Sequence, residues 1–304
     1  MNFAKMHAEP IWSREMQMRR KQLLGHPPRP DRRWSASPAA RGWFPEPAAL
    51  NHRSAVVIVL SFTLWLVPFA SPAESIFVAG ENGDNGGSAA AAENGETVEG
   101  SVGPNGDATN TAYVEAGRGG EGGNGSAVEP NGGAGGSGGS ATTATSTMVN
   151  GESIRSEAFA VGGHGGGGGD PAGGGVFGAG GHGGDGDSMA IGSSPDSSVT
   201  VRSDADGGDG GSSGDAEPSG HGGDAVSFAE GTTGADGAAV RVSNRAAGGN
   251  GGGLHRNAGA FATVAGRGGD GDATAVGVAT GNSEVVVDSS AGGGTGGRVF
   301  GDGP

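Results

Sequence analysis

The 304-residue chain contains no cysteine, one tyrosine and few other aromatic residues. Without cysteine it forms no disulfide and offers no thiolate as a metal ligand or nucleophile. Aromatic rings contribute much of the apolar area that a core buries, so their scarcity argues against a thick hydrophobic core. Basic residues are also few: 18 Lys+Arg stand against 33 Asp+Glu, a net charge of −15. These shortages argue against an ordinary globular domain.

Glycine is what the chain has in abundance, with 70 Gly and 15 Pro, or 85 of the 304 residues together. Aperiodic sequences with this much Gly and Pro are usually low-complexity or disordered. The charge divides near residue 73: residues 1–73 hold 10 Lys+Arg and 4 Asp+Glu, and residues 74–304 hold 8 Arg and 29 Asp+Glu, a net of −21. Because the second part repels phosphates and anionic headgroups, we expect no nucleic-acid partner.

One uncharged apolar run, Ser54–Ala70, predicts export. A basic pair precedes the run, and the small residues Ser71 and Ala73 follow it at positions −3 and −1 of a cleavage site. We therefore predict a signal peptide over residues 54–73, cleaved after Ala73, and a secreted or cell-surface protein. The alternative is an uncleaved membrane anchor over residues 54–70.

The segment before this run, residues 1–53, is basic and interrupted by proline, with no sustained apolar period. Such a segment cannot bury enough surface to fold alone, so we expect a disordered N-terminal extension. The alternative is that translation starts near Leu50 and that residues 1–49 are not translated.

From residue 74 onward, Gly-rich blocks alternate with paired apolar segments. Many blocks repeat the triplet Gly-Gly-X, as in "GGAGGSGGS" (Gly132–Ser140). The segments between blocks alternate with a period of two, which predicts strands, and Asn150-Gly151 between two of them is a hairpin signal. We therefore predict a mainly β and irregular fold, built as an irregular repeat of short β-hairpins and Gly-Gly-X segments, with a degenerate first repeat over residues 87–117. The predicted strand pairs are 141–149 with 153–161, 187–192 with 198–205, 224–230 with 238–247, and 273–280 with 284–291.

The Gly-Gly-X triplet fits a polyproline II-like helix, which has three residues per turn and no internal hydrogen bonds. Every X then lies on one edge, and the bare glycine edges let neighbouring chains approach and exchange backbone hydrogen bonds. Glycine, however, loses the most backbone entropy on ordering. The alternative is therefore that the blocks are flexible linkers and that the acidic region is largely disordered.

The Gly-rich sequence pattern of Gly132–Ser140 and of "GGNGGGL" (Gly248–Leu254) resembles the glycine-rich PGRS-type repeats of actinobacterial surface proteins. It is also similar to the tiled Gly-Gly-X helices of glycine-rich antifreeze proteins. The resemblance covers residues 80–297 and lies in composition, so it implies a surface location and no residue-level function. The helical domain that precedes PGRS repeats is not visible here, and the acidic X positions depart from both groups.

Aspartates in the Gly blocks suggest a calcium site. The stretch "GGDGDATAV" (Gly268–Val276) resembles the nonapeptide of calcium-binding β-rolls, although Asp272 falls one place early and no tandem copy follows. The candidate ligands are Asp185, Asp187, Asp270 and Asp272. The alternative is that these aspartates are solvated turn residues.

Three histidines at X positions, His164, His182 and His221, form a metal-binding ladder if the blocks stack in register, and are otherwise plain exposed residues. The sequence shows no nucleophile elbow, no zinc-protease motif and no phosphate loop. We therefore predict no enzymatic activity, no catalytic residue and no cofactor apart from the calcium hypothesis.

We expect a secreted, non-enzymatic glycine-rich repeat protein that acts as a structural, surface or extracellular-matrix component and associates with itself, the matrix or the cell surface. One alternative is an adhesin-like or ice-type surface binder that uses rows of Thr, Ser and Ala, for which "ATTATSTM" (Ala141–Met148) is the nearest candidate. Another alternative is a disordered acidic spacer.

Overall fold

The computed structural model describes residues 73–301 except 215–216 and 257–263. The predicted N-terminal extension and residues 54–72 of the predicted signal segment lie outside the described residues. Fourteen strands and no helix occur in the described part. The strands are β1 (Ala73–Ala79), β2 (Val98–Val102), β3 (Thr109–Glu115), β4 (Ala141–Met148), β5 (Ile154–Val161), β6 (Gly186–Ser194), β7 (Val199–Asp206), β8 (Ser213–Gly214), β9 (Ala225–Thr233), β10 (Ala239–Ala247), β11 (Leu254–Arg256), β12 (Gly271–Ala279), β13 (Glu284–Gly292) and β14 (Val299–Gly301).

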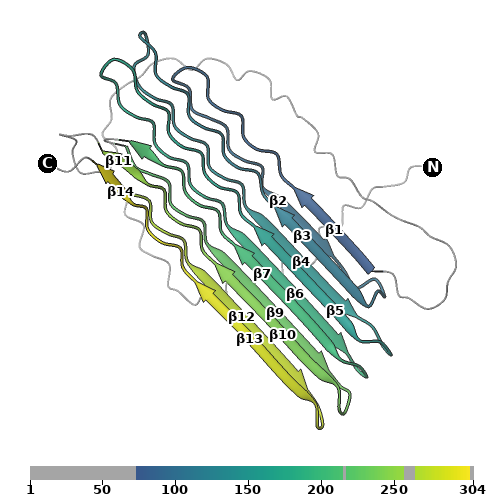
Figure 1. Ribbon diagram of the computed structural model, residues 1–304. Coiled ribbons are helices and arrows are strands. Elements are labelled where there is room, and N and C mark those ends of the chain that lie inside the picture. The colour runs from purple at the N-terminus through teal and green to yellow at the C-terminus, as the bar shows by residue number, and fades with distance from the viewer. Residues whose placement is uncertain (1–72, 215–216, 257–263, 302–304) are drawn as a thin grey trace, which may run out of the picture. The chain divides into compact units, whose positions relative to one another are not determined.

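The long strands form two sheets (Figure 1). Layer A has the order β1-β3-β5-β7-β10-β13, and layer B has the order β12-β9-β6-β4-β2. A third, small sheet has the order β14-β11-β8. Every strand pairing is parallel, and each joins a strand to the equivalent strand of a neighbouring repeat. The mainly β fold is therefore confirmed.

The predicted hairpins are wrong, because the two strands of each predicted pair belong to different sheets. β4 pairs with β2 and β6 in layer B, whereas β5 pairs with β3 and β7 in layer A. The Asn150-Gly151 turn exists, with Gly151 at φ 83°, but it carries the chain from one layer to the other. Each strand has one apolar face, and a hairpin would leave both faces on the same uncovered side of one sheet. A turn that joins strands of different layers, here called an arch, instead lets their apolar faces point toward each other. The neighbouring repeats then supply the backbone hydrogen-bond partners of each strand.

The core between the layers is thin and made of small residues. Ile154, Val199 and Val240 form a buried row in layer A. Opposite them, Gly192 and Gly231 of layer B leave room for valine methyl groups, and a Cβ at Gly231 would lie 3.0 Å from methyl carbons of both Val240 and Val242. Close approach of the sheets therefore depends on glycine, which agrees with the scarcity of aromatic residues.

Polar side chains also line this core. The hydroxyls of Ser188 and Ser203 lie 2.7 Å apart, and Ser227 donates to the carbonyl of Ser203 at 2.9 Å. Asn244 donates to the carbonyls of Ser227 and Thr274. Because these buried groups are bonded across the layers, they cost little to bury and fix how the two sheets face each other.

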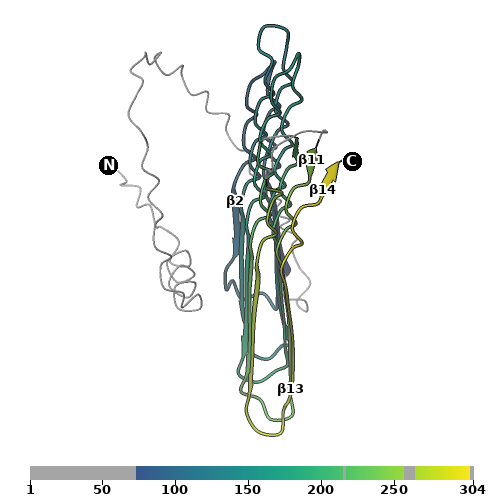
Figure 2. The same ribbon diagram turned by 90° about the vertical axis from the view of Figure 1, so that its left-hand side faces the viewer.

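Gly-rich segments extend both layers beyond the strands (Figures 1 and 2). Each layer A strand continues into a Gly-rich segment that leads away from the strands, which we call an outgoing segment. A Gly-rich segment that leads back, which we call a returning segment, precedes each of β2, β4, β6, β9 and β12. One repeat is thus a layer A strand, an outgoing segment, a returning segment and a layer B strand. The outgoing segments are 80–87, 116–125, 162–170, 207–212, 248–253 and 293–298.

Candidate functional site

The three positions of the Gly-Gly-X triplet make three different kinds of hydrogen bond. The second glycine bonds across the layers: Gly136 donates to the carbonyl of Gly120 at 2.9 Å, Gly166 to Gly136 at 2.8 Å, and Gly181 to Gly166 at 2.8 Å. A Cβ at Gly166 would lie 1.9 Å from the carbonyl oxygen of Gly120, so no other residue fits without moving the backbone. We call this zigzag the central ladder; its glycines are Gly120, Gly136, Gly166, Gly181, Gly211, Gly220, Gly252, Gly266 and Gly297.

The first glycine bonds within its own layer, to the carbonyl of X in the next repeat. Gly119 donates to His164 at 2.9 Å, and Gly165 donates to Asp209 at 2.8 Å. Both glycine N–H groups of a triplet are thus satisfied by neighbouring segments, as obligatory backbone pairing requires.

Where the X residue of the preceding repeat has a short acceptor side chain, the N–H of X bonds to it. In layer A the N–H of Asp209 donates to Nδ1 of His164 at 2.9 Å, and the N–H of Asn250 donates to Oδ1 of Asp209 at 2.6 Å. In layer B the same arrangement links an Asp row, which consists of Thr97, Ser140, Asp185, Asp224 and Asp270. The X side chain is therefore a short hydrogen-bond acceptor, and the abundance of Asn, Asp, Ser and His at X was the sequence signal for it.

Two of the three candidate histidines lie side by side in layer B. The rings of His182 and His221 stack with centroids 5.1 Å apart and planes 21° apart, and the N–H of His221 donates to Nδ1 of His182 at 2.9 Å. Burial, and then the neighbouring His221 ring, lower the pKa of His182 from its ordinary value. His164 lies in layer A, where Nδ1 is 3.7 Å from a carboxylate oxygen of Asp209. Two of the three histidines of the hypothetical metal-binding ladder thus lie side by side. The Nδ1 atoms of all three histidines accept backbone N–H groups.

The four calcium candidates are not brought together. Asp224 lies between Asp185 and Asp270 in the Asp row. The carboxylate of Asp185 accepts the N–H of Asp224, and the carboxylate of Asp224 accepts the N–H of Asp270. Asp187 on β6 and Asp272 on β12 are separated by Val226 of β9. In the part of the chain that the structure describes, no three His, Asp or Glu side chains are placed to hold a metal ion. Asp185 therefore has a role in stacking that differs from that of a solvated turn residue.

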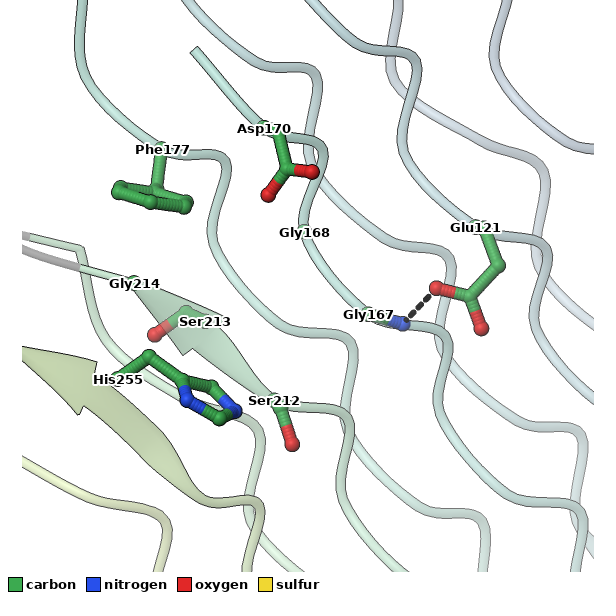
Figure 3. Close-up of a pocket in the computed structure, with 9 residues that line it drawn as sticks. All are labelled: Glu121, Gly167, Gly168, Asp170, Phe177, Ser212, Ser213, Gly214 and His255. Atoms are coloured by element: carbon green, nitrogen blue, oxygen red, sulfur yellow. Dashed lines mark hydrogen bonds between the residues drawn. The ribbon is translucent and has the colours of Figure 1, made fainter. Parts of the chain in front are cut away.

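A pocket of about 410 Å³ opens on the outgoing and returning segments (Figure 3). At one side of it position X is glycine, at Gly167, which lies near Glu121 and Ser212 of the neighbouring repeats. The carboxylate of Glu121 accepts the N–H of Gly167 at 2.7 Å. A ligand in this pocket meets carboxylates, an imidazole, an aromatic ring and hydroxyls. The lining residues are Glu121, Gly167, Gly168, Asp170, Phe177, Ser212, Ser213, Gly214 and His255.

The groups in this pocket serve the fold. The hydroxyl of Ser213 donates to the carbonyl of Glu217 at 2.8 Å, and the ring of His255 stacks on Phe300 with centroids 5.3 Å apart. Phe177 packs on Gly214, where an added Cβ would lie 2.3 Å from the ring. The pocket therefore presents no serine bonded to a histidine base, the arrangement that nucleophilic catalysis uses.

The outer face of layer A carries an aromatic stack that was not predicted from the sequence. Phe77 and Tyr113 stack with centroids 5.3 Å apart, Tyr113 and Phe159 lie 6.4 Å apart, and the guanidinium of Arg202 lies 5.1 Å from the Phe159 ring centre. Burial, followed by the charge of Glu115, raises the pKa of Tyr113. The strand register places Phe77, Tyr113 and Phe159 side by side, because they are equivalent positions of successive repeats, and Arg202 lies two residues before the position in register with Phe159.

The chain matches no protein-family model and no curated protein. One solved structure that it matches is the nine polyproline type II helical bundle antifreeze protein of the springtail Granisotoma rainieri, at 18% identity over 73% of this chain and 94% of that chain, with a TM-score of 0.15. A likeness at that TM-score carries no argument about fold or function. Among the described residues, no helix is long and apolar enough to cross a membrane.

Proposed function

We propose that this chain is a secreted, non-enzymatic, glycine-rich repeat protein that serves as a structural component of a cell surface or extracellular matrix. The observation that carries the proposal is the three-way division of roles in the Gly-Gly-X triplet. Both glycine N–H groups and the N–H of X are bonded to neighbouring segments. The composition thus serves to build a two-layered array without a large core, and a polyproline II-like conformation of the Gly segments fits the three-residue period.

The charged groups support a structural role. Catalytic acids and bases need to be held rigidly and partly desolvated so that their pKa values shift toward the working pH. Here Asp224 and Asp270 of the Asp row are exposed and Asp185 is half-buried, and Asp185 and Asp224 each use a carboxylate oxygen to accept a backbone N–H. The outer faces of the array then offer charge and hydrogen-bonding groups to water and neighbours.

Export remains part of the proposal. We propose that residues 54–73 are a signal peptide cleaved after Ala73. β1 begins at Ala73, so this cleavage leaves six of its seven residues, Glu74–Ala79, on the mature chain. The processed protein thus retains the first strand of layer A.

The adhesin-like and ice-type alternatives need a displayed row of threonines. In β4, however, Thr143, Thr145 and Thr147 face the core and are at most 1% exposed. The alternative of a disordered spacer leaves the acceptor side chains at X without a role. Both alternatives therefore explain less of the sequence than the structural proposal does.

Cell fractionation tests this proposal. With an antibody against residues 74–304, we expect the protein in the medium or on intact cells, where added protease digests it, with Glu74 at its N-terminus. Protein that remains inside the cells and is protected from the protease would contradict the proposal. A membrane-embedded form that keeps residues 54–70 would favour the anchor alternative.

A further inference from the structure

We propose that copies of this chain join head to tail, with β13 of one copy pairing in parallel with β1 of the next. This inference rests on the proposed structural function and names the partner as a second copy. Among the described residues, the first and last strands of layer A, β1 and β13, each have a neighbouring strand on one side only, and the two edges are chemically complementary.

The edge strands have little of the usual protection. Natural edge strands are blunted by charged side chains, above all lysine, by proline or by bulges. β13 has no lysine and no proline between Glu284 and Gly292; its charged residues are Glu284 and Asp288, and Val285, Val286 and Val287 are 42–45% exposed. At the other end, β1 exposes 64% of Phe77. An exposed edge of this kind is a template for another strand.

The register shows which backbone groups face each open side. The N–H of Ile154 donates to Ser198 in the next repeat, and the N–H of Arg155 donates to Ala108 in the preceding one. Val285 is in register with Ile154 through Val240 and Val199. By the alternation of a parallel strand, Val285, Val287 and Ser289 therefore direct their N–H and C=O groups outward.

At β1 the register places the outward groups at alternate residues as well. Ala73 is in register with Arg155 through Thr109. Ala73, Ser75 and Phe77 therefore direct their N–H and C=O groups toward the open side, away from β3. Docking that continues the register places Gly292 beside Ala79 of the next copy and Ser289 beside Ile76.

The Gly segments decide the polarity of the contact. Within the array, Gly248 donates to the carbonyl of Gly292 and Gly251 to that of Thr295. Their equivalents at the last outgoing segment, Gly293 and Gly296, donate no hydrogen bond to any described residue.

The first outgoing segment has carbonyl groups that lack a donor among the described residues. The carbonyls of Asn82 and Asn85 accept no hydrogen bond from the described part of the chain, although their equivalents at Arg118 and Glu121 accept from Gly83 and Gly86. The glycine N–H groups of the last outgoing segment thus complement the X carbonyls of the first. A head-to-tail contact pairs these donors with these acceptors in the register that the array already uses, so the proposed contact is head to tail.

Layer A is one strand longer than layer B, so β13, β1 and the Gly segments after them make the contact, and one strand position stays open in layer B. Repeated head-to-tail contacts give an open filament unless the rotation between copies closes a ring. The net charge of −21 on residues 74–304 opposes association, so added salt strengthens it by screening.

Proline substitutions that block one edge at a time test the proposal. Ser289→Pro blocks the β13 edge and Ser75→Pro blocks the β1 edge; proline is tolerated where the N–H faces outward from an edge strand. Ser289→Ala and Ser75→Ala are the matched controls. Sedimentation velocity on the full chain, expressed in a secreting host, measures the association at low and high salt, and circular dichroism and thermal melts check that each variant is folded.

We expect oligomers for the wild type and both alanine variants, monomers for each proline variant alone, and a heterodimer when the two proline variants are mixed. The mixture keeps one intact joint, so this result is specific to head-to-tail pairing. Oligomers of Ser75→Pro alone would overturn the proposal in favour of contacts between identical ends. A monomeric wild type that is folded and exported would overturn the self-association while leaving the proposed structural function intact.

Discussion

At the scale of single residues, the glycines of the central ladder carry the tightest requirement. The Cβ of Gly166→Ala would lie 1.9 Å from the carbonyl oxygen of Gly120, so the backbone must move and the bonds to Gly136 and from Gly181 weaken. We expect a loss of about 2–4 kcal/mol in the free energy of unfolding, measured by urea denaturation.

Gly87→Ala is the matched control for this variant, because nothing lies within 4 Å of a Cβ at Gly87. We expect it to change the free energy of unfolding by less than about 0.5 kcal/mol. Equal effects of the two substitutions would mean that the central ladder does not contribute to stability.

His182 makes stability depend on pH. Its pKa is lowered in the folded protein, so the unfolded chain, with a histidine pKa of about 6.5, binds the proton more readily. Stability therefore falls as the pH drops below about 6.5. Protonation also removes Nδ1 as the acceptor for the N–H of His221.

His182→Asn retains an acceptor at this position, as Asn94 does two repeats earlier in the same layer, and does not titrate. Thermal melts between pH 7.5 and pH 5.5 compare the two proteins. We expect the midpoint of the wild type to fall further than that of the variant. Identical pH profiles would show that His182 is not the group responsible.

At the scale of an element, the Asp row ties successive returning segments together. In Asp224→Ala the N–H of Asp270 loses its acceptor, which lies at 2.8 Å in the wild type. We expect a loss of about 0.5–1.5 kcal/mol in unfolding free energy, because water replaces the carboxylate only in part.

Asp224→Asn separates this hydrogen bond from charge. The amide oxygen keeps the acceptor, and the change removes one carboxylate from between Asp185 and Asp270. We expect its stability to equal or exceed that of the wild type in low salt. A loss as large as that of Asp224→Ala would mean that the charge, and not the acceptor, stabilises the row.

The strands were predictable from sequence, and their partners were not. Period-two alternation located both strands of each pair, for example 284–291 for β13 at Glu284–Gly292. The turn at Asn150-Gly151 was also correct, but a turn signal does not distinguish a hairpin from an arch. That choice depends on the repeats on either side, which supply parallel partners that are more than 40 residues away in sequence.

The X side chains show a second limit of the sequence. Short acceptors at X were visible in the composition, but their partner is the X residue of the preceding repeat, 45 residues away for His164 and Asp209 and 39 for Asp185 and Asp224. The irregular spacing of the repeats hides that register. Asp185 could be identified as polar and exposed, and only the register reveals the N–H to which it bonds.

At the scale of the whole array, each repeat bonds chiefly to its immediate neighbours. Stability in such an array is a sum of repeat and interface terms, and opening starts at the ends. A thin core of alanine, serine and valine adds modest burial for each repeat. The backbone hydrogen bonds between layers therefore carry much of the specificity, and their exchange with solvent reports the order of the array.

Hydrogen exchange of the glycine amides tests this description of the array. Gly166, Gly181 and Gly211 donate at 2.8 Å in the middle of the central ladder, whereas Gly293 and Gly296 have no acceptor among the described residues. We expect the first three amides to exchange orders of magnitude more slowly than the last two, because an unbonded terminal amide needs no opening of the array. Uniformly fast exchange would support flexible linkers instead. Protection that appears at Gly293 and Gly296 only at high protein concentration would place the next copy on that edge.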